Sequence, residues 1–501
     1  MFTMKKEIVT FILILLIAWA NDILPILDFC LGIALYYLLF RIIIIYSSKN
    51  LITLNRLKFI LSRYNVFLLV HGLVFILLFF YIDFNIFQEQ GDWFEYHHDG
   101  KSFSNYLRGQ SEFSPIVNDA LTYSYIIGLI YYLFSDSISL ALVLNIFLVI
   151  TSSIWLYILV ERIFDFQVAK YALYLSAFYP YLFLYEILLL KECLIFFLTT
   201  LITLHLYKYY YENKKGSIFI LIPLFIALFN TRFFLIFPFF IFFLYHEIFI
   251  NKKIIKVIIV FSILVLILNS YMNSNDVFKE GTFGDAFFQS GMSIIDADRS
   301  RTAFNYQIKG TDIISFGNIL VNNWQYYLTR VPLYYTNVWT LERIYYIPFL
   351  SKKYKTSEFW LFNLLTYINS LFVWTVMFVS LWGFKRIFFD YRKMTSLIWI
   401  PLIVIPIIVA IFSNNQRYFF VCIYSTIPCI SYGLVHCKKY KDYIILSVLL
   451  IITLIVFVNM DTFIFYPIIV VLLFFVANIM GFLFFRRDSL LEHNLYNQKA
   501  K

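Results

Sequence analysis

A short polar stretch at residues 91–100 is the strongest candidate for a chemical site. Its sequence is GDWFEYHHDG, which sets three carboxylates and two imidazoles directly after the apolar run 59–82. A carboxylate at a membrane surface can act as a general base and take the proton of an acceptor hydroxyl. The stretch therefore indicates a general base or ligand cluster, and the plainer alternative is a solvated polar loop.

Basic residues at the same predicted level would stabilise a departing phosphate. Arg417 follows Asn-Asn-Gln at the mouth of a late apolar run, and Arg232 lies in the turn LFNTRFF. The guanidinium of one arginine can donate two hydrogen bonds to a phosphate. The alternative is that an arginine at a helix end extends its charged group to the membrane interface without binding a ligand. Lys191 and Glu192 interrupt the apolar run YEILLLKECLIFFL, which indicates a surface or a cavity, with a structural ion pair as the alternative.

No cofactor is predicted. Asp296 and Asp298 form a DxD motif, which we interpret as a chance match because the segment is expected to be external. The five cysteines form no CxxC pair, and Glu95 with Asp99 make no metal signature, so a divalent ion is left open without support from the sequence. Three isolated histidines receive no role: His71, His205 and His246.

Membrane helices are the elements expected to position these residues. The chain has 501 residues, of which 61% are hydrophobic and 14% charged, and its mean hydropathy is +0.78. Soluble domains carry about 25% charged residues. We predict an all-α, polytopic transmembrane bundle of about 12–14 spans, each near the length that crosses a bilayer. The predicted spans are 8–24, 28–46, 59–82, 137–160, 168–188, 192–208, 217–229, 233–248, 254–271, 360–384, 396–413, 418–434, 443–459 and 464–485.

Basic residues predict the orientation of these spans. Lys5 and Lys6 place the N-terminus in the cytoplasm, and every second connection is basic up to Arg486 and Arg487. Both termini are therefore expected inside the plasma (inner) membrane. The net charge of +10 would face anionic membrane lipids, so it implies no nucleic acid.

Two external loops are large enough to build a site. The first, 83–136, is acidic and includes a short apolar stretch at 118–134, which we expect to lie in the membrane interface because spanning would invert every later connection. The second, 272–358, is rich in Tyr, Trp and Asn. We accordingly divide the chain into an N-terminal hairpin, a core with the first loop, the second loop and the C-terminal helices: 1–58, 59–271, 272–358 and 359–501.

In their order along the chain, these features resemble the GT-C superfamily of polytopic glycosyltransferases, notably bacterial relatives of protein O-mannosyltransferases and aminoarabinose transferases. The matching positions are Asp92, Tyr96 and His97 in a D-x3-Y-H stretch, the interfacial helix 118–134, Tyr179-Pro180, Glu192 (or Glu186), Arg232, and Arg417-Tyr418 with Pro428. The Pro pair that often opens the interfacial helix is degraded, since only Pro115 is present. The match covers residues 59–250 and, more loosely, 396–434.

The resemblance implies a sugar transfer on the outer face from a polyprenyl-phosphate-linked donor to a hydroxyl of a glycan, lipid or protein. Asp92 would be the general base of an inverting reaction. The remaining residues would bind the substrate and the carrier phosphate: Arg417, Arg232, Glu192, Lys191, Tyr96 and His97.

Two other functions stay open. A polymerase or ligase of lipid-linked oligosaccharides would depend on arginines of the second loop, namely Arg299, Arg301 and Arg330. A transporter or flippase would have an internal repeat and ionisable residues at mid-depth. The sequence contains no convincing repeat, and Arg41 is the main charge within a predicted span.

Overall fold

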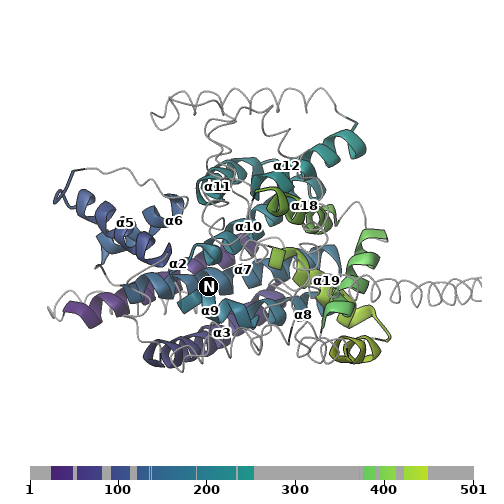
Figure 1. Ribbon diagram of the computed structural model, residues 1–501, viewed down its shortest axis with the longest axis horizontal. Coiled ribbons are helices and arrows are strands. Elements are labelled where there is room, and N and C mark those ends of the chain that lie inside the picture. Colours follow the sequence, from purple (N-terminus) through teal and green to yellow (C-terminus); the bar gives the residue numbers. More distant parts are fainter. Residues whose placement is uncertain are drawn as a thin grey trace, which may run out of the picture. The chain divides into compact units, whose positions relative to one another are not determined.

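The computed structural model describes most of residues 24–252 and part of the C-terminal region. All regular structure in these residues is helical, and no strand occurs among them (Figure 1). The predicted all-α class is therefore confirmed for the described part of the chain. The described residues are 24–48, 53–81, 92–112, 121–134, 136, 138–187, 189–232, 235–252, 372, 376–389, 395–412, 422–439 and 441–449.

The chain divides into two compact units, of which the first comprises Met1–Ile236 with Trp360–Asn369 and the second the remaining residues. The central element of the first unit is α7 (Ile138–Ile163), in which every residue from Leu140 to Val160 is buried. A helix that is apolar all round is stable only when neighbours surround it. Among the described helices, those that pack most extensively against α7 are α2 (Leu24–Ser48), α3 (Leu54–Tyr81), α8 (Phe166–Ala177), α9 (Pro180–Ile187) and α10 (Glu192–Tyr211).

The run predicted as one span at 168–188 consists of two helices. Asp165 caps α8 by accepting hydrogen bonds from the backbone N–H groups of Gln167 (2.7 Å) and Val168 (2.9 Å). The two helices are separated at Tyr179-Pro180. Proline disfavours the helical backbone conformation in the residue before it, and it is well suited to the first position of a new helix. A short turn then joins α9 to α10, and this turn carries Lys191.

The polar stretch after α3 is also helical, which the sequence did not predict. Asp92 is the first residue of α5 (Asp92–Leu107), which packs against α6 (Leu121–Leu133). The close approach needs small residues, since a Cβ on Gly128 would lie 2.8 Å from the carbonyl oxygen of Gly100. Residues 91–100 are therefore not a loop from position 92 onwards, whereas α6 agrees with the helix expected at 118–134.

The second unit is also helical in its described residues. Its main helices are α12 (Ile236–Leu244), the π-helix η2 (Tyr245–Ile250), α18 (Ser396–Phe412) and α19 (Ile423–His436). Aromatic side chains pack between them, with the ring of Tyr245 edge-on to Trp399 at 5.4 Å. Residues 376–389 are helical as well and cross α19.

Replacing Gly383 by Ala should destabilise this unit. A Cβ at position 383 would lie 2.0 Å from the carbonyl oxygen of Cys429, so the two backbones would have to separate. We expect the free energy of unfolding to fall by about 1–3 kcal/mol, as in other overpacked interiors. Denaturant unfolding measures this. The control is Gly72→Ala on α3, where nothing lies within 4 Å of the added carbon; equal stability of the two variants would contradict the crossing.

Two helices in the described part, α7 and α10, are long and apolar enough to cross a membrane. Buried core helices of soluble proteins pass the same criterion, so the predicted number of spans is not settled by them. Several predicted segments lie outside the described residues, wholly or largely: 8–24, 254–271, 272–358, 360–384, 443–459 and 464–485.

Candidate functional site

Lys191 and Glu192 form the centre of a buried polar cluster. They lie where α9 gives way to α10, and only 1% and 2% of their surfaces are exposed. Glu192 is the first residue of α10, where the positive end of the helix dipole favours a carboxylate. Ionisable side chains this deeply buried need charged or polar partners.

Arg232 is the ionic partner of Glu192. It is the last residue of α11 (Ser217–Arg232), and its Nη2 atom lies 3.6 Å from Oε1 of Glu192. A short connection joins α10 to α11, and the two helices pack together, so the end of α11 returns to the level at which α10 begins. Neither carboxylate oxygen of Glu192 has a hydrogen-bond partner within the described structure. The pair is therefore ionic but longer than a direct hydrogen bond.

Tyr96 brings α5 to the same place. The Nζ atom of Lys191 lies 5.7 Å from the centre of the Tyr96 ring, within the range of a cation–π contact. The Tyr96 ring is itself buried and stands edge-on to Tyr123 of α6 at 5.5 Å. We name Tyr96, Lys191, Glu192 and Arg232 the turn cluster. It unites four of the seven residues that the sequence singled out.

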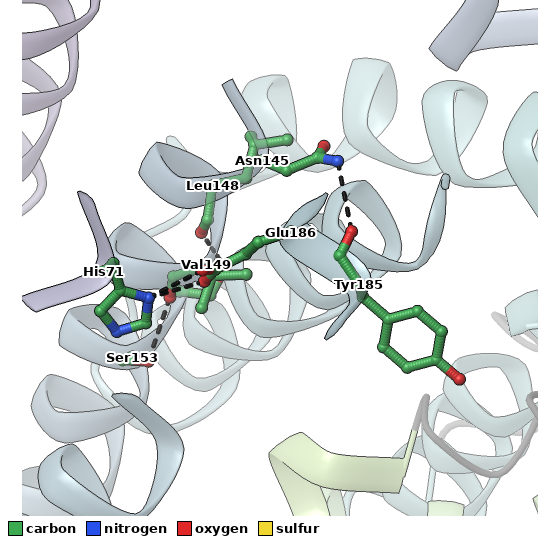
Figure 2. A network of polar contacts seen from close by, with 8 residues as sticks. His71, Asn145, Leu148, Val149, Ser153, Tyr185 and Glu186 are labelled. Carbon is green, nitrogen blue, oxygen red and sulfur yellow. Dashed lines mark hydrogen bonds and ion pairs between the residues drawn. The ribbon is translucent and has the colours of Figure 1, made fainter. Parts of the chain in front are cut away.

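A second buried pair lies on α3 and α9 (Figure 2). The Nδ1 atom of His71 is 2.8 and 2.9 Å from the two carboxylate oxygens of Glu186, and both side chains are buried. The His71 ring also packs on Phe183 at 4.7 Å. The interpretation of His71 as isolated is therefore wrong. The structure also separates the two acids that the sequence left as alternatives, because Glu186 faces His71 and Glu192 faces Arg232.

Asn145 connects the two parts of the site. Its Nδ2 donates to the carbonyl oxygen of Tyr185 on α9 at 3.5 Å, and its Oδ1 accepts from the Tyr123 hydroxyl of α6 at 3.0 Å. Figure 2 shows the contact with Tyr185 next to the His71–Glu186 pair. The sequence analysis did not single out Asn145. Its signal is an amide in the middle of the apolar run LVLNIFL, because buried amides are hydrogen-bonded.

The remaining predicted residues have different places. Asp92 stands one helical turn before Tyr96 on α5. His97 contacts α6, where its Nδ1 atom lies 2.7 Å from the hydroxyl oxygen of Tyr131. We therefore do not include His97 in the turn cluster. Several other predicted residues lie outside the described residues: Arg417, Arg299, Arg301, Arg330, Asp296 and Asp298.

The His97–Tyr131 contact should make the α5–α6 pair sensitive to acid. Burial lowers the pKa of His97 from its ordinary value of 6.5; nearby Lys101 and His98 lower it as well, while Asp136 opposes them. Burial also raises the pKa of Tyr131, so the phenol keeps its proton and can donate to a neutral His97. Since the folded protein binds this proton less readily than the unfolded chain, the contribution to stability is complete above pH 6.5 and declines as the pH falls below it.

Hydrogen exchange of residues 92–107 at pH 7.5 and pH 5 measures this effect. The protection factor divides out the intrinsic slowing of amide exchange at low pH. We expect the protection factors to fall at pH 5 for the unsubstituted protein, which reports faster opening of α5, and a smaller acceleration of opening in Tyr131→Phe. His98→Gln is the control because it keeps the His97–Tyr131 contact, and it should retain the acceleration that Tyr131→Phe reduces. Equal acceleration in Tyr131→Phe and the unsubstituted protein would contradict the role of this contact.

The described residues contain no group of three His, Cys, Asp or Glu side chains placed to hold a metal ion. The turn cluster instead combines two cations with a carboxylate and an aromatic ring. Such a set can hold an anion through Lys191 and Arg232 while Glu192 balances part of their charge. No family model, no curated protein and no solved structure matches this chain.

Proposed function

We propose that this protein is an integral membrane glycosyltransferase. It moves a sugar from a polyprenyl-phosphate-linked donor to an acceptor hydroxyl on the outer face of the membrane. The observation that carries the proposal is the turn cluster, in which Tyr96 of α5 faces Lys191 and Arg232 of α11 pairs with the next residue, Glu192. Their order in the chain is that of the GT-C pattern described above.

Apolar side chains on two helices support a membrane setting. Phe219, Ile222 and Ile226 of α11 are exposed and recur at helical spacing, and 77% of the Phe219 surface is accessible. Leu35, Leu39 and Ile42 make a similar stripe on α2. Exposed apolar stripes of this kind suit lipid contact better than water. With α7 and α10 as spans, the start of α10 lies at a membrane face, and the basic connections assign that face to the exterior.

Lys191 and Arg232 would bind the carrier phosphate. A guanidinium has five N–H donors in a planar fork, so Arg232 can contact Glu192 and a phosphate at the same time. Glu192 would keep the guanidinium oriented toward the turn. The resemblance also assigns Arg417 to the carrier phosphate, and this residue lies outside the described residues.

Asp92 would be the general base. Positions 92 and 96 share a face of α5 because four residues complete about one turn, so Asp92 stands on the helix face that carries Tyr96 to Lys191. In the reaction, the acceptor oxygen bonds to the anomeric carbon while its proton passes to Asp92. The bond from that carbon to the phosphate oxygen breaks, the phosphate leaves with the electron pair, and the configuration inverts.

Binding of undecaprenyl phosphate to the purified protein tests the phosphate site. We expect undecaprenyl phosphate to bind and undecaprenol to bind far more weakly, because a charged hydrogen bond contributes about 1.5–3 kcal/mol. Lys191→Met should weaken binding of the phosphate about tenfold or more, while Lys214→Met, which changes an exposed lysine, should not. Equal binding of the phosphate and the alcohol would overturn the proposal.

A proton-coupled transporter is the second candidate, and one observation favours it. His71 lies inside α3 and pairs with Glu186, and ionisable pairs within membrane helices commonly carry protons. Proteoliposomes loaded with a pH-sensitive dye discriminate between the two candidates. A transporter would move protons along with a sugar gradient and lose this movement in His71→Gln, whereas a transferase would move none.

A further inference from the structure

We infer that Asn145 is a positioning residue, which holds the α6 hydroxyl of Tyr123 and the end of α9 in one arrangement so that Lys191 stays against Tyr96. The inference rests on the proposed function, since it concerns the phosphate site of the same enzyme. Its effect on the site would be exerted through its hydrogen bonds to Tyr123 and Tyr185.

The contact with Tyr185 meets a need of the backbone. The carbonyl of Tyr185 belongs to the last turn of α9, and the last four carbonyls of a helix have no partner inside that helix. The amide of Asn145 donates to this carbonyl from α7, so it ties the end of α9 to the buried central helix. The next residue, Glu186, is held by His71, so two neighbouring residues of α9 are tied to α7 and α3. Together they fix where the following turn, with Lys191, begins.

The contact with Tyr123 extends the same linkage to the α5–α6 pair. Tyr123 is fully buried, and burial raises the pKa of its phenol well above the ordinary value, so the hydroxyl remains a donor to Asn145. The Tyr123 ring stands edge-on to Tyr96, and Tyr96 in turn faces Lys191. The side-chain amide of Asn145 therefore supports both partners of the Tyr96–Lys191 contact. Its oxygen binds α6, which packs on Tyr96, and its nitrogen binds the end of α9, which precedes Lys191.

Three variants separate positioning from plain stability. Asn145→Leu keeps the size of the side chain and removes both hydrogen bonds. Tyr123→Phe removes only the bond to α6 and keeps the ring that packs on Tyr96. Ser153→Ala is the matched control on the same buried helix, because the Ser153 hydroxyl bonds only within α7, to the carbonyl oxygen of Val149 at 3.0 Å (Figure 2).

Hydrogen exchange tests the linkage without any ligand. Loss of a buried hydrogen bond should accelerate local opening about fivefold. Asn145→Leu should accelerate exchange in residues 121–133 and also in residues 189–194. Tyr123→Phe should accelerate exchange mainly in residues 121–133. Ser153→Ala should leave exchange in both segments unchanged. Unchanged exchange at 189–194 in Asn145→Leu would overturn the inference. If Asn145→Leu does not fold, Tyr123→Phe decides: acceleration confined to 121–133 supports the linkage, and no change there overturns it.

Binding of undecaprenyl phosphate tests the consequence for the site. We expect Asn145→Leu to weaken binding about tenfold in the otherwise unchanged protein and not at all in a Lys191→Met background, because the effect acts through Lys191. Equal losses in the two backgrounds would show a general structural role and overturn the inference. If the unsubstituted protein binds no undecaprenyl phosphate while the exchange pattern is as expected, the proposed function fails and the linkage stands.

Discussion

Asp92→Asn will abolish sugar transfer while the protein still folds and inserts. The amide keeps the size of the side chain but cannot accept the proton of the acceptor hydroxyl, and loss of a general base typically slows a reaction by about 10²–10⁴-fold. The measurement is release of undecaprenyl phosphate from an undecaprenyl-phosphate-linked hexose in membranes that contain the variant. Position 92 is the first residue of α5, one turn before Tyr96, and the amide is isosteric with the carboxylate, so we expect the buried contacts of Tyr96 to stay in place.

The control for this experiment is Glu112→Gln. Glu112 is an exposed acid that follows α5 in the same predicted external segment, and its replacement changes the charge by the same amount. We expect full transfer in the control. Full sugar transfer in Asp92→Asn, with donor binding intact, would contradict the assignment of Asp92 as the general base. The phosphate site would then still be tested by the binding of undecaprenyl phosphate.

Arg232→Met should strongly destabilise the protein. The substitution leaves the carboxylate of Glu192 buried without its ionic partner, and breaking a buried pair in this way costs about 3–5 kcal/mol. Denaturant unfolding of the purified protein measures the change. The double variant Glu192→Gln with Arg232→Met should recover part of the loss, because no buried charge is then left without a partner at this position.

Arg162→Met is the matched control for the buried pair. Arg162 forms a comparable pair with Glu212 at 3.7 Å, but about a third of its side chain is exposed. Exposed pairs contribute only about 0–1 kcal/mol, so the control should unfold almost as the unsubstituted protein does. If Arg232→Met is no more destabilising than Arg162→Met, Glu192 and Arg232 do not form the buried pair on which the turn cluster depends.

The helices that are formed by continuous apolar runs were predictable from the sequence, whereas α5 was not. The runs at 192–208 and 217–229 reappear as α10 and α11 with small differences at their ends, because continuous apolar sequence of this length is stable as a helix. α5 is polar overall, and its buried face consists of Tyr96, Gly100 and Ser104 at a spacing of four residues. Gly100 and Ser104 are small and not hydrophobic, which leaves Tyr96 as the one large side chain of this face, so the helical period carries little hydrophobic signal.

The membership of the turn cluster was partly predictable, and its pairing was not. Unusual charges in apolar runs marked Lys191, Glu192 and Arg232, because such residues need partners. The sequence could not decide which acid meets Arg232, since Glu186 and Glu192 lie close together in the chain. The partner of His71 lies 115 residues away, and only the packing of α3 against α9 brings it within reach.

A structure with bound undecaprenyl phosphate tests the central claim most directly. We expect the phosphate oxygens to lie within hydrogen-bonding distance of Lys191 and Arg232, beside the ring of Tyr96, and the isoprenoid chain to run along the helices. A phosphate bound away from Lys191 and Arg232 would contradict the assignment of the turn cluster as the carrier site.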